Sequence, residues 1–307
     1  MVLAPKELSN VIWAATKLGL NDPVLFQAVA IHVSRHMAHF DSVNLSLTLW
    51  GFAKMDMKAP EMFAASRKRV EELLPEFEPH RICNTVWAFA KTGNVDLHLF
   101  KRIAEESLRK MHKFNHSNES MLLYSYALGH VHAPLLFKKA MAQQLPAIQS
   151  GEIQDPRSLS NLLWAISELD LSSEFPALYD AVTTSATTNI HRYSITHMAT
   201  VASAFAKAGV SANELFLLMA HECGMRPIDD NSQWADLVVL NDAFETFGIS
   251  SGAIKETIVR VTECQKVANN LDRHQKLTTL MTDLVGTSIL AAGILIVAAL
   301  VRAYVTV

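Results

Sequence analysis

Apolar residues recur along the chain three and four positions apart, in stretches that alternate with short polar or Gly- and Pro-containing segments. One short phrase, an apolar stretch around an aromatic residue, returns seven times. Its copies read VIWAATKLG, TLWGFAKMD, TVWAFAKTG, LLYSYALGH, LLWAISELD, TVASAFAKAG and LNDAFETFG. Residues three and four apart share one face of an α-helix, so each copy predicts an amphipathic helix. The pattern predicts an all-α protein.

The aromatic position of this phrase, which we call the key position, keeps a nearly constant period. It falls at Trp13, Trp50, Trp87, Tyr124, Trp164, Ser203 and Asp242, at intervals of 37, 37, 37, 40, 39 and 39 residues. Thirteen residues later five of the copies carry a phenylalanine, namely Phe26, Phe63, Phe100, Phe137 and Phe216. Aromatic residues in step with a repeat usually pack, so we expect both sets, the key-position aromatics and these phenylalanines, to form the repeat core.

Each copy extends into a second helix. Asp22 precedes Pro23, Pro60 and Pro134 occupy comparable places, and Ser211 to Glu214 matches a capping box, all of which are typical of helix N-termini. A single helix pair cannot bury its aromatic residues, whereas stacked pairs share a continuous core. The sequence predicts an α-solenoid of about seven helix pairs over residues 1–280.

A second segment, residues 281–307, differs in character. Leu284 to Val301 contains 18 residues without a charge, which is long enough for a membrane-spanning helix. Gly286 and Gly293 would give this helix a small-residue surface for contact with other membrane helices. We expect a transmembrane helix here, and the alternative is a terminal helix buried in protein.

Composition adds few candidates for chemistry. Three cysteines lie far apart without metal-ligand spacing, and the nucleotide-binding and nucleophile-elbow motifs of common enzymes are missing from the sequence. Histidines at helical spacing, such as His32, His36 and His39, are expected to be ordinary side chains. We therefore expect a protein that is not an enzyme and has no cofactor, no metal and no catalytic residue.

Two of the phrases carry a family resemblance. The segments NTVWAFAKTG from Asn84 and NLLWAISEL from Asn161 resemble the core of octotricopeptide repeats, and the 37-residue period resembles heptatricopeptide repeats. The resemblance covers roughly residues 8 to 280. It implies a protein of mitochondria or plastids, where such proteins mostly bind organellar RNA and some are structural parts of ribosomes or membrane complexes.

The distribution of charge along the sequence bears on the choice between RNA binding and a structural role. A lysine follows the key position by four residues at Lys17, Lys54, Lys91 and Lys207, which could form a ladder along a phosphate backbone. Leu128, Glu168 and Thr246 interrupt the ladder, the net charge is −3, and residues 159–240 carry nine acidic against three basic residues. This balance favours protein partners.

With the compartment that the resemblance implies, the apolar segment and the charge pattern favour an accessory subunit of a mitochondrial inner-membrane complex, such as a respiratory-chain complex or ATP synthase. Its repeats would face the matrix, and a plastid membrane is the lesser choice. Its partners would be protein subunits of that complex and, through the last helix, membrane lipid. The alternative is an organellar RNA-binding repeat protein that acts in RNA processing or in the mitochondrial ribosome.

Overall fold

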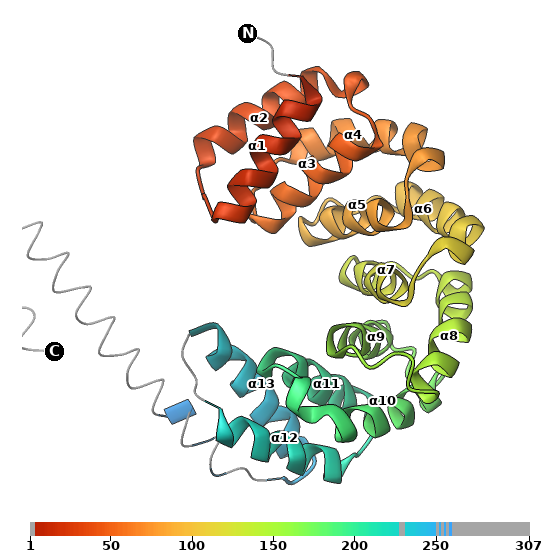
Figure 1. Ribbon diagram of the computed structural model, residues 1–307, viewed down its shortest axis with the longest axis vertical. Coiled ribbons are helices and arrows are strands. Elements are labelled where there is room, and N and C mark those ends of the chain that lie inside the picture. Colours follow the sequence, from red (N-terminus) through yellow and green to blue (C-terminus); the bar gives the residue numbers. More distant parts are fainter. Residues whose placement is uncertain (1–3, 227–230, 250–251, 253–254, 256–257, 260–307) are drawn as a thin grey trace, which may run out of the picture.

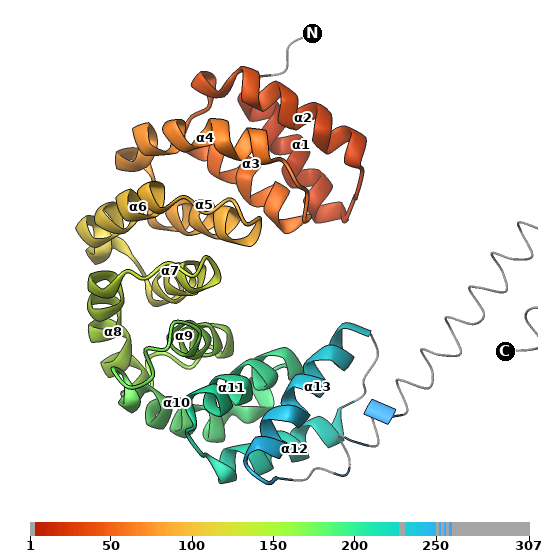
Figure 2. The ribbon, with the colours of Figure 1, turned by 180° about the vertical axis from the view of Figure 1, so that it is seen from behind.

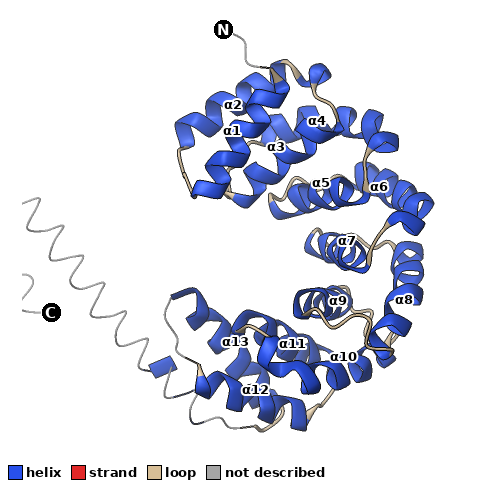
Figure 3. Cartoon of the chain, in the orientation of Figure 1, coloured by secondary structure: helices blue, strands red, loops and turns tan. Residues whose placement is uncertain are grey.

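The computed structural model describes residues 4–226, 231–249, 252, 255, 258 and 259. These residues form thirteen α-helices and four short 3₁₀-helices, and no strand occurs among them (Figure 3). The predicted all-α class is therefore confirmed. Consecutive α-helices pair into units, and we call the two members of a unit its first and second helix.

The first helices contain the key positions. They are α1 Pro5–Leu18, α3 Ser42–Lys54, α5 Pro79–Lys91, α7 His116–Leu128, α9 Pro156–Glu168, α11 Ile195–Ala208 and α13 Asn231–Thr246. The second helices are α2 Pro23–Arg35, α4 Pro60–Leu73, α6 Leu97–Lys110, α8 Pro134–Gln149, α10 Pro176–Asn189 and α12 Asn213–Met225. The described chain thus holds six helix pairs and the first helix of a seventh unit.

The units stack side by side into a curved solenoid. In Figures 1 and 2 the first helices α5, α7 and α9 line the inner side of the arc, and the second helices α6, α8 and α10 form its outer side. Adjacent first helices contact one another more extensively than adjacent second helices do. This difference in closeness gives the stack its curvature, with the first helices on the concave side.

Small residues directly after the key position permit the close approach of the first helices. Gly51 of α3 shows this most clearly, because a Cβ atom built on it would lie 2.3 Å from Ile12 Cγ2 of α1. Ala88, Ser125, Ala165 and Ala204 are buried at the same position in later units. Close helix packing therefore selects these residue types.

Local signals set the helix boundaries. The carboxylate of Asp22 accepts hydrogen bonds from the Val24 and Leu25 amides at the start of α2, and Pro23, Pro60 and Pro134 are the first residues of α2, α4 and α8. The predicted capping box at Ser211 is wrong. Helix α12 begins at Asn213 without a side-chain cap, and the Ser211 hydroxyl bonds the Asn213 side chain instead.

Edge-to-face aromatic pairs join units 1 and 2, 2 and 3, 3 and 4, and 5 and 6. Phe26 packs on Phe52, with ring centroids 5.0 Å apart and planes at 78°. Equivalent pairs are Phe63 with Phe89, Phe100 with Tyr126 and Tyr179 with Phe205. Phe137 and Phe216 are likewise buried. In each pair, the ring that belongs to a first helix lies two residues after the key position. The centre of the core is therefore at this position of the repeat.

A second periodic aromatic position lies in the connections between units. Phe40, Phe77, Phe114 and Tyr193 are buried ten residues before four of the key positions. Basic side chains of the following unit donate hydrogen bonds to three of their carbonyl oxygens: Arg69 to Phe40, Lys110 to Phe77 and Arg226 to Tyr193. The ends of units 1, 2 and 5 are thus held by the units that follow them.

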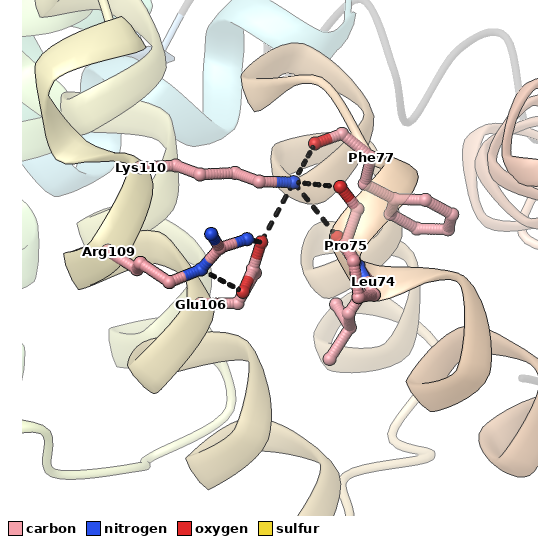
Figure 4. A network of polar contacts seen from close by, with 6 residues as sticks. All are labelled: Leu74, Pro75, Phe77, Glu106, Arg109 and Lys110. Atoms are coloured by element: carbon pink, nitrogen blue, oxygen red, sulfur yellow. Dashed lines mark hydrogen bonds and ion pairs between the residues drawn. The ribbon is translucent and has the colours of Figure 1, made fainter.

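Lys110 is the most extensively bonded of these side chains (Figure 4). Its buried ammonium donates to the carbonyl oxygens of Leu74, Pro75 and Phe77 at 3.0, 2.8 and 2.8 Å, and it pairs with Glu106 at 2.8 Å. Partial burial opposes ionisation of Glu106, but hydrogen bonds from Arg109 and Lys110 outweigh it and lower the pKa of Glu106. The network fixes α6 against the end of α4.

The predicted membrane helix falls on residues beyond the described part of the chain. Leu284, Gly286, Gly293 and Val301 all lie outside the described residues. Within the described part of the chain, no helix combines the length and apolar character that a membrane span requires.

Candidate nucleic-acid interface

One stripe of each first helix faces the concave side of the solenoid. In α3 to α11 the other faces of the helix are covered by the two neighbouring first helices and by a second helix, whereas α1 and α13 each contact one first helix among the described residues. Four positions of each first helix stay exposed or partly exposed. They are the key position, the positions three and seven residues before it, and the position four residues after it. These positions lie one turn apart on one helix face. We call this set the inner stripe, and in α5 it comprises His80, Asn84, Trp87 and Lys91.

The key-position aromatics belong to this stripe and do not form the centre of the core. Trp13 is 45% exposed, and Trp50, Trp87, Tyr124 and Trp164 are partly exposed. The expectation of core packing is wrong for Trp13, and the other four line the concave surface at the margin of the core. The reason is the helix period, because the residue two places later points to the opposite side and takes the buried site.

The lysines four residues after the key position lie in the last turn of their helices, where the helix dipole favours a cation. Lys17, Lys54 and Lys91 are exposed, and none has an ion-pair partner among the residues that the structure describes. The ammonium of Lys17 lies over the Trp13 ring, 5.7 Å from its centroid. Three uncompensated cations therefore follow one edge of the concave face in units 1 to 3.

Units 4 to 6 differ at the same positions. Lys207 pairs with Glu168 at 3.0 Å, and His130 lies 3.7 Å from the same carboxylate. The rings of Tyr124 and Trp164 pack against each other with centroids 4.7 Å apart. The cation of Lys207 is therefore compensated, and the two aromatic rings already have partners.

Carboxamides lie one turn before three of the tryptophans. Asn10, Asn84 and Asn161 are exposed or partly exposed, and their side chains have no hydrogen-bond partner among the described residues. An amide offers both donors and an acceptor, so these groups can bond the edge of a ligand that lies on the stripe.

A hollow of about 960 Å³ opens beside the stripe at the N-terminal ends of α7, α9 and α11. Arg157, Arg192 and His197 line it together with Glu152 and Asp155. Burial and the nearby Arg157 cation lower the pKa of His197. The charges of this hollow are mixed, so it favours neither anions nor cations.

The described residues contain no group of three or more His, Cys, Asp or Glu side chains placed to hold a metal ion. Both described cysteines are buried, and burial raises the pKa of the Cys223 thiol to about 12 and that of Cys83 well above its usual range. Such thiols stay protonated at neutral pH and are poor nucleophiles. The concave face is equipped to bind a partner through cations, aromatic rings and amides.

The fold and this face define a helical-repeat protein with a basic and aromatic concave surface. A family model described as RNA-editing substrate-binding complex 6 protein matches residues 3–175, and the chain belongs to this family. The match includes the first helices α1 to α9, and with them Lys17, Lys54 and Lys91. The family that matches is neither the octotricopeptide nor the heptatricopeptide family. No curated protein matches the chain.

Family membership corrects the main functional prediction. An accessory subunit of a respiratory-chain complex or ATP synthase is wrong, because the matching family is named for an RNA-editing complex. The inner-membrane location that depended on that prediction is wrong for the same reason. The alternative prediction, an RNA-binding repeat protein, agrees with the family.

Proposed function

We propose that this chain is a non-catalytic, RNA-binding subunit of an RNA-editing substrate-binding complex. The observation that carries the proposal is the row of Lys17, Lys54 and Lys91, which are exposed on the concave face without carboxylate partners. Clustered cations supply most of the affinity for a phosphate backbone. The family name supports the choice of RNA as the polyanion.

Protein partners belong to the same proposal. The second half of the chain is acidic, with nine acidic and three basic residues in 159–240, which disfavours a continuous RNA track there. We assign this half to contacts with other subunits of the complex. In this proposal the chain binds RNA through units 1 to 3 and binds other protein subunits through the units that follow.

The experiment measures the affinity of the full-length chain for a fluorescent RNA over a series of salt concentrations. The test variant combines Lys17→Gln, Lys54→Gln and Lys91→Gln. A matched control combines Lys68→Gln, Lys101→Gln and Lys138→Gln, which are exposed lysines on the outer helices α4, α6 and α8. Both variants change the net charge equally.

The inner variant is expected to bind about tenfold more weakly or worse. Its slope of log K against log salt should fall by about 2, because each phosphate contact on a single strand contributes about 0.7. The outer variant should retain both the affinity and the slope. A wild-type chain without salt-dependent RNA affinity, or equal losses in the two variants, would overturn the proposal.

A further inference from the structure

A tryptophan and a lysine recur together, one helical turn apart, in three consecutive units. The pairs are Trp13 with Lys17, Trp50 with Lys54 and Trp87 with Lys91. Residues four apart on a helix are surface neighbours, so each unit presents an indole and an ammonium next to each other. In unit 1 the Lys17 ammonium lies over the Trp13 ring, 5.7 Å from its centroid. The three pairs lie on α1, α3 and α5, which stack next to one another in the solenoid (Figure 1).

The three indoles are accessible, and Trp87 is also held in place by packing. Trp87 packs against the core and is partly exposed, Trp50 is partly exposed, and Trp13 is exposed to 45%. A ring with one side fixed by packing offers its other side to a ligand without a large loss of conformational freedom. Trp87 is therefore a pre-organised platform, and Trp50 and Trp13 offer accessible rings at the same position of the neighbouring units.

An unpaired nucleotide fits this arrangement better than a duplex does. The base of a single-stranded nucleotide exposes a π-face that can stack on an indole, whereas the bases of a duplex are already stacked on one another. The neighbouring ammonium can contact the phosphate of the same strand. The free carboxamides of Asn10 and Asn84 lie one turn away on the same stripe and can bond a base edge.

The row of pairs ends at unit 4. Tyr124 is followed four residues later by Leu128 and Trp164 by Glu168, so neither aromatic has a neighbouring lysine on its own helix. The rings of Tyr124 and Trp164 also pack on each other. The carboxylate of Glu168 would repel a phosphate at the place where units 1 to 3 present an ammonium.

We propose that units 1 to 3 form a binding tract for single-stranded RNA, in which Trp13, Trp50 and Trp87 stack unpaired bases and the lysine of each pair contacts the backbone. This inference rests on the proposed RNA-binding function and adds the type of strand, the stacking residues and the extent of the tract. The tract lies wholly within the residues matched by the family model.

The test compares full-length variants for binding to a single-stranded pyrimidine RNA and to a duplex of the same length. The test variant combines Trp50→Leu and Trp87→Leu. The control is Trp164→Leu, a partly buried tryptophan at the same repeat position but outside the tract. A rescue variant, Trp50→Tyr with Trp87→Tyr, keeps aromatic rings at both sites, and far-ultraviolet circular dichroism verifies the helical content of all variants.

The wild-type chain is expected to prefer the single strand and to show quenched tryptophan fluorescence when it binds. The double leucine variant should lose at least about tenfold in single-strand affinity, because each stacked base contributes about fivefold or more. Its salt dependence should remain, since the lysines are intact. The tyrosine variant should recover most of the affinity, and Trp164→Leu should change it less than about twofold.

The outcomes separate this inference from the proposed function. If the triple lysine variant weakens RNA binding and neither the leucine nor the tyrosine variant does, stacking is refuted and the RNA-binding function stands. Equal affinity of the wild-type chain for duplex and single strand would also refute the stacking. If the leucine variant binds RNA normally but no longer co-purifies with its complex, the tryptophans bind a protein subunit and the inference is wrong.

Discussion

Phe63 of α4 packs edge-on against Phe89 of α5, with ring centroids 5.2 Å apart and ring planes at 83°. The two residues belong to different units, so this contact joins units 2 and 3. The same geometry recurs between units 1 and 2, 3 and 4, and 5 and 6. In a stack of repeats the stability of the whole depends on such nearest-neighbour interfaces.

Removal of one ring should therefore destabilise two units together. Phe89→Ala deletes a fully buried side chain and should lower the free energy of unfolding by about 3 to 5 kcal/mol, measured by urea denaturation. It should also broaden the transition, because the contact between neighbouring units weakens. Leu97→Ala, at a residue that is 71% exposed, is the control and should change stability by less than about 0.5 kcal/mol. Similar losses in both variants would contradict the assigned interface.

The repeat itself could be predicted because the core repeats with it. The phenylalanines thirteen residues after the key position are buried, and prolines begin the second helices where the sequence places them. Which side of each first helix faces the core was harder to predict. Trp87 and Phe89 lie two residues apart and keep the same period, so periodicity alone does not say which of them faces the core.

Two features were not recognised from the sequence, although a signal for each is present. Phe52, Phe89, Tyr126 and Phe205 stand inside the repeated phrases, two residues after the key position. Phe40, Phe77, Phe114 and Tyr193 keep the period in the connections between units, where no helical phrase draws attention to them. The ion pair of Lys207 with Glu168 was hidden as well, because it joins adjacent units and depends on how closely they stack.

The contact between Gly51 and Ile12 gives a prediction about the close packing of α1 against α3. Gly51→Ala should destabilise the protein by about 1 to 3 kcal/mol, because its Cβ would overlap Ile12 Cγ2, despite the better helix propensity of alanine. Ile12→Ala removes that methyl group. In a double-mutant cycle the combined variant should lose less than the sum of the single losses. Additive losses would show that the two residues do not meet.

The buried Lys110 should contribute much more to the free energy of unfolding than its exposed neighbour Arg109 does. Lys110→Met leaves three carbonyl oxygens without their donor and the Glu106 carboxylate without its buried partner, so we expect a loss of about 3 to 5 kcal/mol in urea denaturation. Arg109→Met removes only the exposed partner of Glu106 and should change the free energy of unfolding far less, because exposed ion pairs contribute little. Equal losses of unfolding free energy in the two variants would mean that the hydrogen bonds from Lys110 to the carbonyl oxygens contribute nothing to stability.

A buried carboxyl group in unit 4 gives a prediction about pH. Glu119 is 2% exposed, and burial raises its pKa above the ordinary value of 4.5, although a hydrogen bond from Gln144 at 2.7 Å and the nearby His116 oppose the shift. A carboxyl group with a raised pKa in the folded state holds its proton more firmly there than in the unfolded chain. The free energy of unfolding should therefore fall as pH rises from about 4.5 through the raised pKa of Glu119, and remain lower above it.

Glu119→Gln should remove this contribution. The new amide can still accept from Gln144 Nε2, and it can donate to Gln144 Oε1, which is buried without a partner in the described part of the chain. We expect the variant to be more stable than the wild type by about 1 kcal/mol at pH 7, and the difference to shrink toward pH 4.5, in urea denaturation at a series of pH values. Glu152→Gln, at a side chain that is 66% exposed, should show no comparable gain. A variant that is less stable than the wild type by the same amount at every pH would mean that Glu119 is ionised in the folded protein at no cost.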